Sequence, residues 1–270
     1  ALHDLAGIIL GMPVYEMLGK HGPDSSPCYS GMIYFDDLEP PDKPAGIDAV
    51  LKNCKDDYER GYRQLKVKIG RGNKWMAKQA GIRRDVEVTR AIARRFPDID
   101  VLVDGNNGFT IGEFLQYMEG IGDMKLFWIE EPFHETLEDY AKLREWLREH
   151  GRKTLLADGE ASPDWKVLDA LAERKLLDVQ LVDVAGYGFT PWRKLMPELK
   201  RQGVQASPHT WGSQLKTYYT SHLAAGLGNV VTVEGVTCSS DEVDFGKYTL
   251  KDGKLTPSPD PGFGMRLKGT

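Results

Sequence analysis

The feature that most constrains the fold is a regular alternation of short apolar runs with longer segments of helical periodicity. Between the short runs, apolar side chains recur every three or four positions, as at Ile47, Val50 and Cys54. This alternation predicts an α/β fold with a parallel sheet, and eight strand–helix units predict a (β/α)8-type TIM barrel. The predicted strands lie near residues 28–35, 64–69, 101–103, 126–129, 154–157, 179–182, 204–206 and 230–233.

A doubly wound open sheet is the structural alternative. Such a sheet would be supported by a Gly-x-Gly-x-x-Gly motif directly after a strand, and the sequence contains none in that position. Helix-starting patterns do occur, at Thr110 to Glu113 and at Thr136 to Asp139. The stretch from about Cys238 is polar and rich in Gly and Pro, which indicates a tail rather than a ninth strand–helix unit.

Composition excludes several classes of protein. The 270 residues are 41% hydrophobic and carry a net charge of −5, with no block of Lys and Arg, so nucleic acid is not an expected partner. The longest mostly apolar stretch, 6–15, is too short to cross a membrane, and no signal peptide with a basic start and a small-residue cleavage site is expected. Three widely spaced cysteines, Cys28, Cys54 and Cys238, form no disulfide or metal pattern and favour a reducing, cytoplasmic location.

Ionisable or amide side chains stand at the end of seven consecutive predicted strands, beginning with the second. Because active sites of parallel barrels lie at the carboxyl ends of the strands, these side chains are expected to converge at one mouth. In chain order they are Lys66 and Lys68, Asp104 and Asn106, Glu130, Glu160, Asp183, His209 and Glu234.

Each of these features alone has an ordinary structural explanation. A Lys-x-Lys pair is typical of a solvated strand edge, and a carboxylate after a strand often starts the next helix. The joint pattern is different, because three carboxylates on neighbouring strands are costly to bury unless a cation holds them. Hard oxygen ligands of this kind are those that Mg²⁺ prefers.

The order Lys-x-Lys, Asp-x-Asn, Glu-Glu-Pro, Gly-Glu, Asp and His resembles the mandelate racemase-like branch of the enolase superfamily, which includes the mandelate racemase/muconate lactonizing enzymes. The resemblance implies a modified (β/α)7β barrel and one Mg²⁺ per chain, for which Mn²⁺ can substitute. It assigns the metal to Asp104, Glu130 and Glu160. Asp158, two residues before Glu160, remains an alternative third ligand.

The resemblance also implies the roles of the remaining groups. Lys68 would be the base on one face of the substrate, with a pKa lowered by Lys66 and by the metal. His209, oriented by Asp183, would act on the other face. Two residues would bind the substrate: Asn106, beside the metal, and Glu234, as a protonated acid or through an intervening group.

Two reactions fit these groups. If the substrate has a β-hydroxyl, removal of the α proton gives an ene-diolate that loses water, so a sugar acid becomes a 2-keto-3-deoxy acid. Without a leaving group, exchange of the proton between two faces gives a racemase or epimerase. Enolase-superfamily sites with Lys or His bases and Mg²⁺ are an established pattern. A non-catalytic barrel fragment is the alternative of another class.

The resemblance divides the chain into three ranges. Residues 1–26 would be a helical lead-in from an N-terminal capping domain missing from this sequence, 27–237 the catalytic TIM barrel, and 238–270 a C-terminal tail that packs back towards the cap. The absence of an initiator Met at Ala1 and the apolar positions Leu2, Leu5 and Ile8 agree with that expectation. The expected partners are a small carboxylate substrate and further copies of the same chain.

Overall fold

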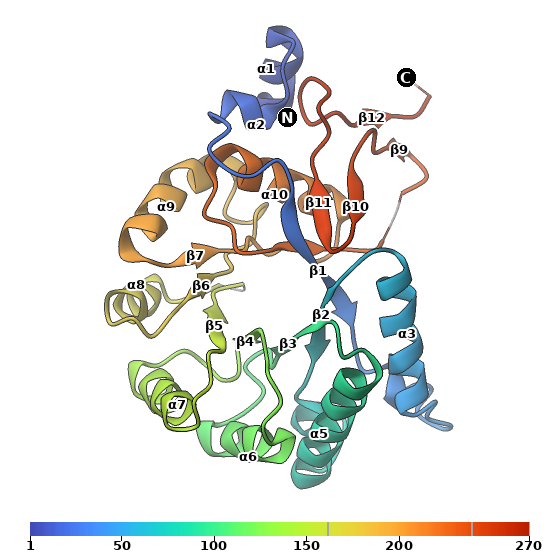
Figure 1. The fold of residues 1–270 in the computed structure, drawn as a ribbon, viewed down its shortest axis with the longest axis vertical. Coiled ribbons are helices and arrows are strands. Elements are labelled where there is room, and N and C mark those ends of the chain that lie inside the picture. Colours follow the sequence, from blue (N-terminus) through green and yellow to red (C-terminus); the bar gives the residue numbers. More distant parts are fainter. Residues whose placement is uncertain (161, 239, 270) are drawn as a thin grey trace.

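The structure, a computed structural model, describes residues 1–160, 162–238 and 240–269. It is a mixed α/β fold built on a parallel sheet (Figure 1). The parallel strands are β1 (Ser26–Ile33), β2 (Gln64–Lys68), β3 (Asp100–Asp104), β4 (Trp128–Glu130), β5 (Leu155–Asp158), β6 (Val179–Gln180), β7 (Gln205–Ala206) and β8 (Val233–Gly235).

Strand β1 pairs in parallel with both β2 and β8, and the order then runs from β2 through to β7. A parallel bridge between Ala206 and Val230 joins β7 to the segment that precedes β8. All eight predicted strand positions therefore contain a strand or lead directly into one. The eighth begins at Val233, later than predicted, so Glu234 lies inside the strand and not after it.

Helices follow the strands and lie around the outside of the sheet in Figure 1. The capping box predicted at the start of α6 is confirmed: the Thr110 hydroxyl accepts from the Glu113 N–H at 3.3 Å, and Glu113 accepts from the Thr110 N–H at 2.9 Å. The helices are α1 (Leu2–Leu10), α2 (Val14–Met17), α3 (Ile47–Glu59), α4 (Arg71–Lys74), α5 (Lys78–Arg95), α6 (Ile111–Ile121), α7 (Leu137–Glu149), α8 (Trp165–Glu173), α9 (Phe189–Gln202) and α10 (Gln214–Leu227), with a 3-10 turn at Asp36–Leu38.

The period of two along each strand separates the core from the site. In β2, Leu65 and Val67 pack into the hydrophobic core that the helices cover. Because alternate side chains of a strand point to opposite faces, Lys66 and Lys68 then share the other face. A second, smaller apolar cluster lies on that inner face below the polar groups: Tyr29, Leu102, Trp128, Ala157, Val179 and Leu181.

The segment after β8 packs against the sheet and against the start of the chain. Strand β11 (Lys254–Thr256) pairs antiparallel with β1 and with β10 (Thr249–Lys251), while β9 (Val243–Asp244) pairs with β12 (Arg266–Leu267). The Phe263 N–H donates to Asp4 Oδ1 at 2.8 Å, and the Val14 N–H donates to Gly262 O at 2.9 Å. These contacts fix α1 and α2 beside the tail.

Among the described residues, the longest and most apolar helices fall short of what crossing a membrane requires.

Candidate metal and active site

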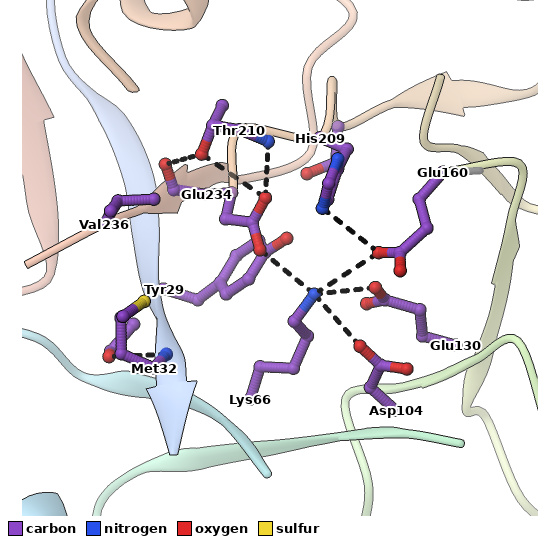
Figure 2. Close-up of polar contacts among 12 residues, drawn as sticks. Tyr29, Met32, Lys66, Asp104, Glu130, Glu160, His209, Thr210, Glu234 and Val236 are labelled. Carbon is purple, nitrogen blue, oxygen red and sulfur yellow. Dashed lines mark hydrogen bonds and ion pairs between the residues drawn. The ribbon is translucent and has the colours of Figure 1, made fainter. Parts of the chain in front are cut away.

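Three carboxylates converge where β3, β4 and β5 end (Figure 2). Asp104, Glu130 and Glu160 each offer an oxygen, and these oxygens lie within 4.8 Å of one another. Asp104 and Glu130 are direct partners in the β3–β4 register, which brings their side chains onto one face. Glu160 reaches the same place from the loop after β5.

Two of these carboxylate oxygens have no hydrogen-bond donor among the described residues. Glu130 Oε2 and Glu160 Oε2 are both buried and accept no hydrogen bond, although Glu160 Oε2 lies within ion-pair distance of His209 and Lys66. Leaving a buried acceptor unsatisfied costs about 1–3 kcal/mol, and more when the group is charged. A hard divalent cation bound between the three side chains would satisfy both oxygens, so the donor set fits Mg²⁺.

Asp158, the alternative third ligand, lies outside this cluster. Its carboxylate accepts a hydrogen bond from the Tyr140 hydroxyl. Burial raises the pKa of Asp158 to about 7, although the Tyr140 hydroxyl opposes that rise. The geometry therefore groups Glu160, and not Asp158, with Asp104 and Glu130.

The ammonium of Lys66 lies among the carboxylates, as the dashed lines in Figure 2 show. Its Nζ is 2.6 Å from Glu130 Oε1, 3.2 Å from Asp104 Oδ2 and 4.0 Å from Glu160 Oε2. Burial alone would lower the pKa of Lys66, but Glu130 and Glu234 outweigh it and the pKa is raised well above its ordinary value. Lys66 is therefore a permanent positive charge in the site.

Lys68, at the end of β2, donates to Asp104 Oδ2 and to Asn106 Oδ1, the latter at 2.6 Å. Burial and the Lys66 ammonium both lower the pKa of Lys68, but Asp104 and the other carboxylates raise it, and the net pKa is raised. The lowered pKa expected from the sequence is thus not produced by these side chains alone. A cation among the carboxylates would offset the charge that raises it.

Asn106 connects the third strand with the fifth. Its Nδ2 donates to Glu160 Oε1 at 2.7 Å, and its backbone N–H donates to Asp104 Oδ1 at 3.0 Å. The residue has a φ of 40°, in the left-handed region that Asn tolerates better than most residues. Asn106 therefore orients two members of the carboxylate cluster.

His209 approaches the cluster from the loop after β7. Its Nδ1 lies 3.0 Å from Asp183 Oδ2, and its Nε2 lies 3.4 Å from Glu160 Oε2. Burial would raise the pKa of Asp183, but hydrogen bonds from Lys216 and from the Gly186 N–H outweigh it, and the pKa is lowered. An ionised Asp183 fixes the proton on His209 Nδ1 and leaves Nε2 directed at the site.

Glu234, on β8, faces Lys66 across 3.0 Å and accepts from the Thr210 N–H at 2.6 Å. Burial raises the pKa of Glu234, but Lys66, His209 and the Thr210 N–H together lower it by more, so the net pKa is lowered. The expectation of a protonated Glu234 does not fit this environment. The other expectation, contact with substrate through an intervening group such as Lys66, stays a prediction.

The sequence reasoning missed Arg71, which is fully buried. Arg71 forms ion pairs with Asp37 at 2.6 Å and with Asp85 at 2.8 Å, and it donates to the carbonyl oxygen of Lys68 at 3.2 Å. It therefore supports the backbone that carries Lys68. An arginine is mostly exposed in folded proteins, so its occurrence shortly after a strand gives no signal for this buried network.

Glu131 supports the cluster through a hydrogen bond to the backbone of Glu160. Its Oε1 accepts from the Glu160 N–H at 3.0 Å. Burial and the neighbouring Glu160 raise the pKa of Glu131 to about 8.

Comparison with known proteins defines the class of this fold and site. A family model described as "Enolase C-terminal domain-like" matches residues 49–270. The chain belongs to this family, within the enolase superfamily.

Among curated relatives, the D-galactarolactone cycloisomerase of Agrobacterium fabrum is 27% identical over 223 residues, which cover 79% of this chain and 52% of that protein. The L-talarate/galactarate dehydratase of Salmonella typhimurium is 28% identical over 211 residues, which cover 77% of this chain and 48% of that protein. The chain thus spans about half the length of these relatives.

Among solved structures, galacturonate dehydratase from Geobacillus sp., complexed with D-galacturonate and 5-keto-4-deoxy-D-galacturonate, is 30% identical with a TM-score of 0.92. The match covers 99% of this chain and 71% of that chain. A mutant of the same enzyme, complexed with Mg, gives a TM-score of 0.93 at 30% identity, covering 99% of this chain and 70% of that chain.

Proposed function

We propose that this chain forms the catalytic portion of a Mg²⁺-dependent acid-sugar dehydratase. The enzyme would remove the proton next to a substrate carboxylate and eliminate the β-hydroxyl as water, giving a 2-keto-3-deoxy acid. The observation that carries the proposal is the cluster of Asp104, Glu130 and Glu160, with Lys68 hydrogen-bonded to Asp104 and His209 directed at Glu160.

Asp104, Glu130 and Glu160 would hold one Mg²⁺, with Mn²⁺ as a substitute. A bound cation would supply positive charge against the substrate carboxylate while the α proton leaves. The Lys66 ammonium would bind the same carboxylate, since it already lies among four acidic side chains. Asn106 would contact the substrate beside the metal, and Glu234 would act through Lys66.

Lys68 and His209 would carry the proton transfers. They come from β2 and from the loop after β7, and they contact different members of the carboxylate cluster. A substrate bound over the cluster would therefore meet Lys68 on one face and His209 on the other. We assign abstraction of the α proton to Lys68, and donation of a proton to the departing hydroxyl to His209 with its partner Asp183.

The relatives support an acid sugar as the substrate class. D-Galacturonate and 5-keto-4-deoxy-D-galacturonate, both bound to the Geobacillus enzyme, differ by loss of water across the carbon next to the carboxylate and its neighbour. In both this change and the formation of a 2-keto-3-deoxy acid, the carbon next to the carboxylate becomes a ketone and the following carbon loses its hydroxyl. Aldonates, aldarates and uronates are therefore the first substrates to test.

A racemase or epimerase of a 2-hydroxy acid is the second candidate. The presence of two separate proton-transfer groups, Lys68 and the His209–Asp183 pair, favours it specifically, because two-sided exchange needs both. A non-catalytic barrel fragment explains the site less well. It would have no reason to bury three carboxylates with two oxygens that accept no hydrogen bond.

We also infer that the sheet closes into a modified (β/α)7β barrel. The β1–β8 pairing and the Ala206–Val230 bridge support closure on both sides of the eighth strand. Within it, 1–26 would be the lead-in, 27–237 the catalytic barrel and 238–270 the tail. In the tail, Lys254 and Leu255 pair with β1, and Phe263 hydrogen-bonds to Asp4 of the lead-in.

A panel of acid sugars incubated in D₂O with Mg²⁺ and followed by NMR tests the proposal. Dehydration predicts loss of one or more substrates and appearance of a 2-keto-3-deoxy acid. A racemase would instead return the acid with deuterium at the α carbon and its configuration scrambled. If no member of the panel gives product or takes up deuterium while Mg²⁺ is bound, α-proton abstraction from acid sugars is refuted.

A further inference from the structure

A lysine that the comparisons and the motifs do not assign contacts the His209–Asp183 pair. Lys216 lies in the first turn of α10, and its Nζ is 2.8 Å from Asp183 Oδ2. The same oxygen is 3.0 Å from His209 Nδ1. Lys216 and His209 therefore share one carboxylate oxygen.

The other oxygen of Asp183 is held by the backbone. Asp183 Oδ1 accepts from the Ala185 N–H at 2.8 Å and from the Gly186 N–H at 2.6 Å. The carboxylate thus has four donors, and its plane is fixed by the turn that follows β6. Of the four, only Lys216 brings a permanent charge without taking part in the turn.

A purely structural role is the ordinary explanation. Lys216 Nζ also donates to the carbonyl oxygen of Trp211 at 3.2 Å, so it links the loop after β6 to the loop after β7. A link of this kind would be served by any contact between the loops. The contact observed is instead with the oxygen that orients His209, and the Lys216 side chain is only 23% exposed.

We propose that Lys216 is a positioning residue for proton transfer by His209. Its ammonium keeps Asp183 ionised and holds Oδ2 in line with His209 Nδ1, so that the imidazole stays directed at the carboxylate cluster. The inference rests on the proposed function, because it concerns the face of the substrate that His209 serves. It assigns no contact between Lys216 and substrate.

Three variants test this role. Lys216→Met removes the ammonium and keeps most of the side-chain volume, whereas Lys216→Arg keeps the charge and the donors. Lys194→Met makes the same charge change at an exposed lysine on α9 and is the matched control. A thermal midpoint for each variant shows whether the fold is retained.

The first readout separates the two halves of the reaction. Lys216→Met should lower kcat for elimination by roughly 10- to 100-fold, less than the roughly 10²–10⁴-fold contributed by an acid or base itself, with KM nearly unchanged. Exchange of the α proton with D₂O, which Lys68 performs, should persist, and Lys216→Arg should recover most of the lost kcat. A link between loops would instead reduce exchange and elimination together, and that outcome would overturn the proposal, as would kcat equal to that of Lys194→Met.

The second readout needs no substrate, so it remains decisive if the proposed function fails. In protein labelled with ¹⁵N-histidine, the ring Nδ1–H signal of His209 is assigned by its loss in His209→Asn. The proposal predicts that this proton is protected from exchange with water in the unmodified protein and in Lys216→Arg, and exposed in Lys216→Met. Equal protection in Lys216→Met and Lys194→Met would overturn it. Absence of turnover by the unmodified protein would contradict only the proposed function.

Discussion

The Lys66 ammonium lies 3.0 Å from Glu234 Oε1, although the two residues come from β2 and β8, which both pair with β1 and not with each other. The side chains meet over β1, at Gly31. A Cβ at that position would lie 2.5 Å from Glu234 Oε1, so the glycine leaves the space in which the ion pair forms.

Gly31→Ala is therefore expected to displace Glu234 from Lys66 while the fold is kept, because the atom that must move is the end of a flexible side chain. Misplacement of a site group by about 1 Å can cost of the order of 10²-fold in rate, which sets the expected loss of kcat/KM. The control is Gly112→Ala on α6, where a Cβ meets no atom within 4 Å. Equal kcat/KM for the two variants would show that the Lys66–Glu234 pair does not matter to turnover.

Binding of Mg²⁺ should raise the thermal midpoint, since a ligand of the native state stabilises it. At about 100 times the Kd the stabilisation is about 2.7 kcal/mol, or roughly 5 °C for a domain of this size. Glu130→Gln should abolish the rise, and Glu145→Gln, at an exposed position on α7, should retain it. If neither Mg²⁺ nor Mn²⁺ changes the thermal midpoint of the unmodified protein, the cation site is ruled out.

The affinity for Mg²⁺ should increase with pH. Burial and the nearby Asp104 raise the pKa of Glu130 well above its ordinary value, so protons compete with a metal for this carboxyl. Calorimetric titrations between about pH 6 and about pH 8, in buffers of different ionisation enthalpy, should show proton release and a falling Kd. Binding that is independent of pH and releases no proton would contradict competition between protons and the metal at Glu130.

Lys68→Ala and His209→Asn should each reduce turnover by about 10²–10⁴-fold, the usual contribution of an acid or base. Both variants should keep the Mg²⁺-induced rise in thermal midpoint, because neither residue belongs to the carboxylate cluster. If Lys68 alone abstracts the α proton, His209→Asn will still exchange that proton with D₂O. Full turnover by either variant would remove that residue from the mechanism.

His222, buried on α10, predicts a loss of stability in acid. The Tyr15 N–H donates to its Nδ1 at 3.2 Å, so its Nε2 carries the proton and donates to the Tyr248 hydroxyl at 2.8 Å. Burial lowers the pKa of His222 from 6.5 to about 3. Between these values the unfolded chain binds a proton that the folded chain does not, so stability falls as pH falls, by up to about 1.4 kcal/mol per pH unit.

The matched variant is His222→Gln, which can accept and donate in the same places but does not titrate in this range. Denaturant unfolding between about pH 6.5 and about pH 4 should show a shallower pH dependence for His222→Gln than for the unmodified protein. Parallel curves for the two proteins would show that the lowered pKa of His222 does not contribute to the loss of stability in acid.

The strand ends and the order of their polar residues were predictable from the sequence, because strand spacing and alternation fix which side chains share a face. Lys66 and Lys68 share the inner face for this reason. The charge states were not predictable. The raised pKa of Lys68 and the lowered pKa of Glu234 depend on how closely Asp104, Lys66 and Thr210 approach them in space.

Contacts between distant elements were also beyond the sequence pattern. Arg71 is buried because Asp37 and Asp85, which precede and follow it in the chain, both face it. The tail strands, including β11 against β1, lie in a polar stretch that lacks the apolar runs by which the inner strands were found. Such pairings depend on the assembled surface on which they pack.

The most direct test of the central claim is Mg²⁺-dependent formation of a keto-deoxy acid from the acid-sugar panel. The unmodified protein should produce it with Mg²⁺, stop when EDTA removes the metal and resume when Mg²⁺ is restored. Glu130→Gln should produce none under any of these conditions, while Glu145→Gln should match the unmodified protein. Product that persists undiminished in EDTA or in Glu130→Gln would contradict the role of the carboxylate cluster. A complete lack of product from every acid sugar, with Mg²⁺ bound, would contradict the proposed dehydration.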